Sequence, residues 1–389
     1  MIHPDEALKA VLEAARAPRL ETVPLERALG RVLPIELRAQ VDQPPFDKSA
    51  MDGFACRGPS PERGWLVRET IAAGSSSKRT LAEGECARIM TGAPLPSGAD
   101  RVQRVEWSEQ SAGRVKFTKP EPVDNIIRRG ENLARGGLLL GPRRLAPQDL
   151  GLLAADGRAG LELAVPPTVG VLSTGSELVE PGLPLGGADI YDSNRRQALA
   201  QAEAAGCPTR DFGRVADDPA ATLAAVSAAL EGCDILVVSG GVSAGDFDFV
   251  PAALARAGVE TVFHGVAMKP GRPTYFGRRG PSSVFGLPGN PVSVFVNFEV
   301  FVKPLIYALM GLDWRPPTVP APAARQIGRG SAERVEWLPV AFGPDGFEPV
   351  EYRGSSMLNV FTRAEGLLRL EVGQRVVPKG ALASVRLLS

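Results

Sequence analysis

Four glycine-rich runs carry the polar and charged residues of this sequence that could perform chemistry. They are Ser-Thr-Gly-Ser-Glu at 173–177, Ser-Gly-Gly-Val-Ser-Ala-Gly-Asp-Phe-Asp at 239–248, Met-Lys-Pro-Gly-Arg-Pro at 268–273 and Leu-Pro-Gly-Asn-Pro at 287–291. Small residues let backbone N–H groups approach phosphate oxygens, and a helix N-terminus adds positive potential. Lys269 and Arg272 could neutralise a bound anion, the arginine through its forked donors. These residue types predict a site for a phosphate-containing ligand.

A glycine that follows a strand is most often only a turn, so each run alone is weak support for a site. In doubly wound folds, however, ligands bind where loops leave the carboxyl ends of the strands, and these runs follow predicted strands of one sheet. Their joint occurrence favours an anion-binding crevice. The residues that we expect to contact the ligand are Ser173, Thr174, Gly175, Ser239, Gly240, Gly241, Asp246, Arg272, Pro288, Gly289, Asn290 and Pro291.

Carboxylates in the same loops predict a divalent cation. Glu177 and Asp248 end two of the runs, and Asp217 precedes Asp218-Pro219 at a predicted helix start. Asp218 is the natural N-cap there, with proline at the first helical position, which leaves Asp217 free for the crevice. Acids beside phosphate repel it, and a bridging Mg²⁺ that keeps its own waters removes the conflict. We therefore expect Glu177, Asp217 and Asp248 to be metal ligands, with solvation as the alternative for each.

Other metal and nucleophile chemistry has little support in the sequence. Only His3 and His264 are present, which disfavours a histidine zinc site and a Ser-His-Asp triad. The four cysteines form no Cys-x-x-Cys pair. A second group of motifs lies around Asp52-Gly53 and Thr91-Gly92. Taken alone, these residues predict only two turns.

Composition restricts the class of protein. The chain has 389 residues, a formal charge of zero and 44% hydrophobic residues, which is typical of a soluble globular protein. The balanced charge disfavours nucleic acid as a partner. The longest apolar runs are too short or too interrupted to span a bilayer, and no signal peptide is visible, so we expect a cytoplasmic protein without a membrane partner.

Alternating strands and helices between residues 168 and 311 would position the four runs. Apolar strands at 169–172, 234–238 and 283–286 alternate with helices at 194–205, 219–230, 249–257 and 291–310. This rhythm predicts a multidomain α/β protein whose central domain is a mostly parallel, doubly wound sheet. Residues 1–43 with 133–165 read as a helical, mixed domain, and 318–389 as a small β domain. Residues 44–132 read as an inserted β module with short strands at 65–71, 85–90, 100–107 and 114–119.

The motifs taken together resemble the molybdopterin molybdenumtransferase family, called MoeA in bacteria and equivalent to the gephyrin E domain. Besides the four runs, the resemblance is carried by Asp-Lys-Ser-Ala-Met-Asp-Gly-Phe-Ala at 47–55, Ile-Met-Thr-Gly-Ala-Pro at 89–94, Asn-Ile-Ile-Arg-Arg-Gly-Glu-Asn at 125–132 and Ile-Tyr-Asp-Ser-Asn at 190–194. It extends from about residue 5 to the C-terminus.

The resemblance implies the last step of molybdenum cofactor synthesis. Molybdate and adenylylated molybdopterin react, molybdenum is placed on the dithiolene, and AMP is released, with Mg²⁺ required. It also implies four domains with a C-terminal β barrel, other cofactor-synthesis proteins as partners, and a homodimer in which the crevice of one subunit faces the β module of the other.

By motif position, the catalytic residues of the family correspond to Asp52, Thr91, Glu177, Asp217, Asp248 and Lys269, and its shaping prolines to Pro288 and Pro291. In this reading Lys269 and Arg272 hold the diphosphate link, the acids position Mg²⁺ and an attacking oxygen, and Asp52 and Thr91 orient molybdate or the pterin. The sequence departs from the family at Phe54, Asn132 and Gly265, where relatives carry tyrosine, aspartate and lysine.

Two rival functions stay open at this point. One is the related adenylyltransferase step, which attaches AMP from ATP and uses the same type of sheet domain. Its enzymes resemble the sheet domain alone, so the flanking modules argue against it. The other is a scaffold that binds a partner peptide without catalysis, against which the intact crevice residues argue.

Overall fold

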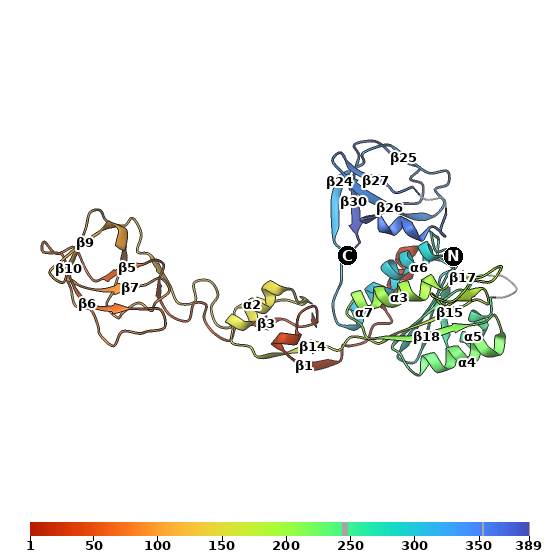
Figure 1. Ribbon diagram of the computed structural model, residues 1–389, viewed down its shortest axis with the longest axis horizontal. Helices are drawn as coiled ribbons and strands as arrows, with labels where there is room; N and C mark the ends of the chain where they lie inside the picture. Colours follow the sequence, from red (N-terminus) through yellow and green to blue (C-terminus); the bar gives the residue numbers. More distant parts are fainter. Residues whose placement is uncertain (243–247, 352–353, 389) are drawn as a thin grey trace. The chain divides into compact units, whose positions relative to one another are not determined.

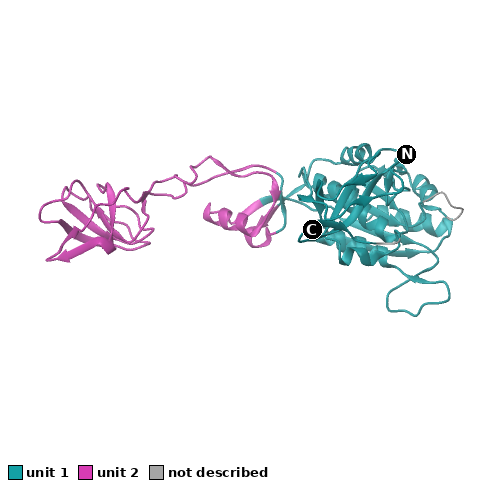
Figure 2. Ribbon diagram, turned by 90° about the horizontal axis from the view of Figure 1, so that it is seen from above, with its two compact units in different colours: residues 1–21, 30–34, 162–389 teal, residues 22–29, 35–161 magenta. Residues whose placement is uncertain are grey.

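The computed structural model of the chain describes residues 1–242, 248–351 and 354–388 and divides into two units (Figure 2). One unit comprises residues 1–21, 30–34 and 162–389, and the other comprises residues 22–29 and 35–161. The first unit holds the predicted crevice. Asp246, one of the predicted ligand contacts, lies outside the described residues.

A six-stranded sheet forms the centre of the first unit (Figure 1). Its order is β18 (Thr209–Val215), β15 (Val169–Thr174), β19 (Ile235–Ser239), β23 (Ser282–Leu287), β22 (Tyr275–Arg279) and β20 (Glu260–His264). The first four strands are parallel, β22 is antiparallel to β23, and β20 is antiparallel to β22. The predicted α/β class, with a mostly parallel central sheet, is therefore confirmed.

Both faces of the central part of this sheet are covered, which explains why β15 and β19 are buried at every residue. Val171 and Val237 pack on the side of α3 (Ser193–Ala204) and α6 (Pro291–Asn297), whereas Leu172 and Val238 pack on the side of α4 (Pro219–Leu230) and α5 (Val250–Arg256). Figure 1 shows α3, α6 and α7 on one face and α4 and α5 on the other. The alternation follows from the two-residue period of a strand.

The predicted long helix at 291–310 is continuous but not uniform. It consists of α6, a π-helical turn η3 (Phe298–Val302) and α7 (Lys303–Leu309). Residues 291–309 are long and apolar enough to cross a membrane, but 89% of their most apolar window is buried inside the protein. Burial of this extent is typical of a core helix, and this helix packs against the central sheet.

The C-terminal residues add a second, mixed sheet to the first unit. Its strands run in the order β21 (Met268–Lys269), β26 (Val335–Gly343), β28 (Gly366–Leu370), β30 (Leu382–Leu387) and β24 (Thr318–Pro322), and β27 (Gly346–Pro349) pairs with β26. A separate core forms around Phe347, Leu368 and Val385. Because β21 pairs with β26, Lys269 is held at the edge of this sheet. The closed barrel stays a prediction. Further elements of this unit are α1 (Pro4–Leu12), β2 (Val32–Leu33), β16 (Leu178–Val179), β17 (Ile190–Tyr191), β25 (Ile327–Gly328), the 3-10 helix η4 (Leu358–Thr362) and β29 (Val376–Val377).

The second unit contains a six-stranded sheet, the α-helix α2 (Pro147–Ala155), the 3-10 helices η1 (Leu25–Arg27) and η2 (Val105–Trp107), and short strands paired in twos. The sheet order is β8 (Arg101–Arg104), β5 (Gly53–Cys56), β7 (Glu85–Ile89), β6 (Trp65–Ile71), β10 (Arg114–Phe117) and β9 (Ser108–Ser111). Strands predicted at 65–71, 85–90 and 114–119 are present. The segment predicted as one strand at 100–107 ends instead in a 3-10 turn at Val105–Trp107, after which β9 forms a hairpin with β10.

Candidate functional site

A crevice of about 590 Å³ lies at the carboxyl ends of the parallel strands β15, β19 and β23. Neighbouring parallel strands end at the same edge of a sheet, so the loops that follow them meet there. Predicted site residues that line the crevice are Thr174, Gly175, Glu177, Asp217, Ser239, Gly240, Gly241, Asp248, Gly289, Asn290 and Pro291. Ser173 is fully buried beneath them.

The Gly240-Gly241 loop passes over Thr174 too closely for any side chain. A Cβ on Gly240 would lie 2.5 Å from the carbonyl oxygen of Thr174, and one on Gly241 would lie 2.7 Å from its Oγ1. Both glycines also have positive φ, at 90° and 63°. The Thr174 hydroxyl is buried and has no hydrogen-bond partner among the described residues. The glycines therefore bring the backbone of two strand-end loops together around an unsatisfied polar atom.

Two of the carboxylates are held by the loop at 173–177. The Asp217 carboxylate accepts a hydrogen bond from the Ser176 N–H at 2.9 Å, and the Asp217 N–H donates to Ser176 Oγ at 3.0 Å. Glu177 folds back over Gly175, where a Cβ would lie 2.6 Å from Glu177 Oε2. The neighbouring Asp218 accepts from the Ala221 N–H at 2.7 Å and caps α4, as the sequence predicted. Asp217 is thus a loop residue that lines the crevice.

The donor set of the crevice suits a hard cation that arrives with a phosphate. Glu177, Asp217 and Asp248 all line it, but among the described residues no three acidic, histidine or cysteine side chains cluster tightly enough to hold a metal ion. Mg²⁺ does not need such a cluster, since it is usually bound by one or two carboxylates, several waters and substrate phosphates. Oxygen donors that line a cavity with room for a larger phosphate-containing ligand meet that requirement.

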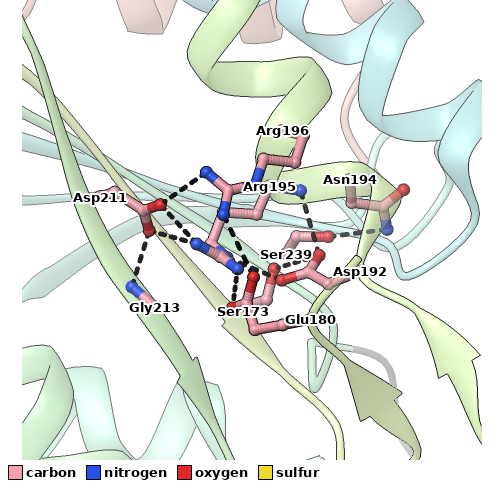
Figure 3. A network of polar contacts seen from close by, with 9 residues as sticks. All are labelled: Ser173, Glu180, Asp192, Asn194, Arg195, Arg196, Asp211, Gly213 and Ser239. Carbon is pink, nitrogen blue, oxygen red and sulfur yellow. Dashed lines mark hydrogen bonds and ion pairs between the residues drawn. The ribbon is translucent and has the colours of Figure 1, made fainter. Parts of the chain in front are cut away.

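The start of α3 ties the strand ends together, and the sequence did not predict this role (Figure 3). Asp192 caps α3 by accepting from the Arg195 N–H at 3.2 Å, and it also accepts from Ser173 Oγ at 3.0 Å. Asn194 Nδ2 donates to Ser239 Oγ at 2.9 Å and to the Gly289 carbonyl at 2.6 Å. One helix terminus therefore contacts the ends of β15 and β19 and the loop after β23. The only sequence signal was the Ile-Tyr-Asp-Ser-Asn motif.

A buried arginine anchors this arrangement. Arg195 is 2% exposed, and its guanidinium contacts the carboxylates of Asp192, Asp211 and Glu180 (Figure 3). Burial alone would lower the pKa of Arg195, but its hydrogen bonds to Asp192 and Asp211 raise it above its usual value. Burial likewise opposes ionisation of Asp211, yet the Gly213 N–H and Arg195 hold the pKa of that carboxyl below its usual value. Arg195 and Asp211 therefore each stabilise the charged form of the other.

The structure places Lys269, Arg272 and Pro288 in a second cavity of about 670 Å³, which shares Asn290 with the crevice. Its lining contains three basic residues, Lys269, Arg272 and Arg334, against two acids, Glu336 and Glu351. Lys269 Nζ lies 2.8 Å from Glu336 Oε1, so part of the positive charge is balanced. The sequence did not predict Arg334, because it lies just before β26, outside the four runs.

Asp52 and Thr91 contact each other directly in the second unit. Asp52 precedes β5 and Thr91 follows β7, and these strands are antiparallel neighbours with Gly53 opposite Ile89. Asp52 Oδ1 accepts from the Thr91 N–H and from Thr91 Oγ1, both at 2.7 Å. These two bonds, the backbone one first, lower the pKa of Asp52 below its usual value. The two turns thus form one ionised, hydrogen-bonded pair.

Both histidines, two of the four cysteines and Phe54 lie in surroundings that favour a structural role for them. His3 Nδ1 caps α1, and His264 Nε2 lies 2.7 Å from the Val242 carbonyl. Burial raises the pKa of Cys207 to about 12 and that of Cys233 to about 11, so neither is a thiolate at neutral pH. Phe54 is fully buried against Phe117 in an apolar cluster. The hydroxyl of a tyrosine at this position would be removed from water.

A third cavity of about 740 Å³ lies away from the predicted site. Its walls include Leu8, Leu12, Trp314, Trp337 and Arg386, and none of the predicted site residues lines it. Its size alone therefore does not make it a candidate for phosphate chemistry.

Comparison with known proteins gives the family. Residues 2–157 match the family described as "MoeA N-terminal region (domain I and II)", and residues 170–308 match the "Probable molybdopterin binding domain". The chain is similar to proteins named molybdopterin molybdenumtransferase from Haemophilus influenzae, at 34% identity over 99% of this chain and 98% of the relative, and from Bacillus subtilis, at 36% identity over 78% and 73%. A solved structure of the molybdopterin biosynthesis moeA protein from Pyrococcus horikoshii covers the whole chain, and all of its own, with a TM-score of 0.87 and 27% identity. The chain belongs to the molybdopterin molybdenumtransferase (MoeA) family.

Proposed function

We propose that this protein inserts molybdenum into molybdopterin, using molybdate and adenylylated molybdopterin and releasing AMP. The observation that carries the proposal is the crevice, which combines closely packed glycine loops with three acidic residues at one sheet edge. Backbone N–H groups in such loops suit the oxygens of a diphosphate link. The names of the relatives support the same substrate class.

In the proposed reaction a molybdate oxygen attacks the phosphorus of the AMP group, and the phosphoanhydride bond breaks with its electrons going to the pterin phosphate. One dithiolene sulfur then displaces AMP, which keeps that oxygen, from molybdenum. The second sulfur displaces another molybdate oxygen, which leaves as water with the two thiol protons. The Gly241 N–H and the Thr174 hydroxyl would hold the phosphate oxygens, while the Gly240 N–H, which donates to the Leu287 carbonyl at 3.0 Å, fixes the loop. Glu177, Asp217 and Asp248 would hold Mg²⁺, which when bound neutralises charge on the diphosphate. Asp192, Asn194 and Arg195 would position these loops without touching substrate.

The second cavity would take the molybdate dianion. It adjoins the crevice through Asn290, and three basic residues line it. The substrates comprise two anionic groups, a diphosphate link and an oxyanion, and the chain offers two adjoining cavities. Lys269, Arg272 and Arg334 would therefore bind molybdate beside the pterin end of the substrate.

The proposed active form is a homodimer in which Asp52 and Thr91 of one subunit complete the site of the other. The family resemblance supports this arrangement. Asp52 and Thr91 form a preorganised ionised pair, whose chemistry suits orientation of a polar substrate group.

The proposal is tested by supplying the purified chain with adenylylated molybdopterin, molybdate and Mg²⁺ and measuring AMP. We expect AMP release that depends on molybdate. A parallel reaction with ATP, Mg²⁺ and molybdopterin addresses the adenylyltransferase rival. Accumulation of adenylylated pterin there, without molybdate-dependent AMP release in the first reaction, would show that the rival is correct.

A further inference from the structure

One side of the crevice is apolar and exposed, although the ligand expected there is a polyanion. Leu178, Ile190 and Tyr191 line the same cavity as Glu177 and Asp217. Ile190 is 54% exposed and Tyr191 43% exposed. Exposed apolar groups beside a polar site indicate contact with an apolar part of a ligand.

Backbone hydrogen bonds join the segment that forms this apolar wall to the segment that contains Glu177. The Ile190 N–H donates to the Glu177 carbonyl at 2.9 Å, and the Asp192 N–H donates to the Val179 carbonyl at 2.9 Å, so β17 runs parallel to β16. Tyr191 Oη donates to the Leu183 carbonyl at 3.0 Å, which fixes the ring of the tyrosine. A group that lies against the wall therefore lies next to Glu177.

Two buried polar atoms in the same cavity lack partners and also point to a ligand. Thr174 is 6% exposed, and its Oγ1 has no hydrogen-bond partner among the described residues. The buried Asn194 Oδ1 has none either, although the Nδ2 of the same side chain is bonded twice. Buried polar atoms are normally paired, so a ligand with hydrogen-bonding groups is the natural partner. The cavity thus offers an apolar wall, two unsatisfied polar atoms and carboxylates.

We propose that the wall formed by Leu178, Ile190 and Tyr191 binds a planar heteroaromatic ring of the substrate, with Tyr191 as the stacking residue. This inference rests on the proposed function, whose substrate carries two such rings, a purine and a pterin. Both combine an apolar face with hydrogen-bonding edges, which matches the wall and the unpaired Asn194 Oδ1, while the Thr174 hydroxyl faces the phosphate. Tyrosine is well suited to the contact, because stacking on a base is worth about a tenfold or greater change in affinity.

The test measures binding by the full chain, with Mg²⁺ present, of AMP, ribose 5-phosphate and molybdopterin, the last under anaerobic conditions. We expect Tyr191→Ala to weaken binding of one ring-containing ligand about tenfold and to leave ribose 5-phosphate unchanged, while Tyr191→Phe keeps most of the affinity. The matched control is Leu185→Ala, an exposed residue of the same segment that does not line the crevice, and it should change nothing.

The outcomes show which ring binds to the wall, and they distinguish failure of this inference from failure of the proposed function. A loss confined to AMP identifies the purine, and a loss confined to molybdopterin identifies the pterin. Equal binding of both ligands by wild type and Tyr191→Ala overturns the inference, as does an equal loss in Tyr191→Phe. Failure of wild type to bind AMP at all contradicts the proposed function instead.

Discussion

At the scale of single residues, neighbouring aspartates at the start of α4 have different roles. Asp218 caps the helix, whereas Asp217 is bonded to the loop of Ser176 and lines the crevice. The sequence allowed this division to be predicted, because proline at the first helical position marks Asp218 as the cap. Arg195 could not be predicted in the same way. Its partners come from residues 180, 192 and 211, and no spacing in the sequence shows that they meet.

The two aspartates give a matched pair of variants. Asp217→Asn should reduce molybdate-dependent AMP release by about 10²-fold or more, because it removes a charge from the reacting site. Asp218→Asn keeps a capping oxygen and should retain near wild-type turnover and stability. Both are checked by steady-state AMP release and thermal unfolding. Equal activity of Asp217→Asn and wild type would refute the role given to Asp217.

The Asp52–Thr91 pair predicts a pH dependence. Removing the hydroxyl with Thr91→Ala should raise the pKa of Asp52, but the backbone N–H, which is the larger cause, should keep it below the ordinary value of 3.8. Carboxyl NMR titration of Asp52 in both proteins measures the change. Because the folded pKa is lowered, the stability that the hydroxyl contributes is present at neutral pH and disappears as the pH falls through that pKa. A stability difference between the proteins that grows toward acid pH would contradict this account.

At the scale of elements, the strand and helix alternation was predictable because buried parallel strands are continuously apolar. β15 and β19 are buried at every residue, and the loops after them lie together at one edge. The separation of Lys269 from the crevice was not predictable. Residues 268–269 leave the central sheet and pair with β26, more than 60 residues later in the chain, and short strands of that kind carry no periodic signal. The π-helical turn η3 was not predictable either, because its residues have the same apolar composition as the helical residues on both sides of it.

The anchoring of α3 predicts a large stability difference between adjacent arginines. Arg195→Met leaves the buried Asp192 carboxylate without its oppositely charged partner, so the free energy of unfolding should fall by about 3–5 kcal/mol. Arg196 contacts Glu180 and Asp211 as well, but its side chain is 54% exposed, and Arg196→Met should cost no more than about 1 kcal/mol. Urea denaturation compares the two. Similar losses in both variants would show that Arg195 is not the anchor.

At the scale of the whole molecule, the proposed homodimer predicts complementation between two inactive variants. In a two-fold dimer, mixing Asp52→Ala with Asp217→Ala subunits gives heterodimers in which one of the two sites carries neither substitution. With random pairing, about a quarter of the wild-type activity should return. AMP release before and after subunit exchange measures the recovery.

The control for this experiment is a mixture of Asp217→Ala and Asp248→Ala. Both residues line the crevice of one subunit, so every site in their heterodimer carries a substitution and no activity should return. Recovery in this control, or none with Asp52→Ala, would rule out a site shared between subunits in the proposed way.

The proposed function requires that the sheet edge formed by the ends of β15, β19 and β23 binds the nucleotide phosphate. A crystal structure of the protein with AMP and Mg²⁺ tests it most directly. We expect the phosphate beside Thr174, Gly240 and Gly241, with the cation between it and at least one of Glu177, Asp217 and Asp248. A phosphate bound elsewhere, such as in the cavity lined by Trp314 and Arg386, with the crevice filled only by water, would contradict the account.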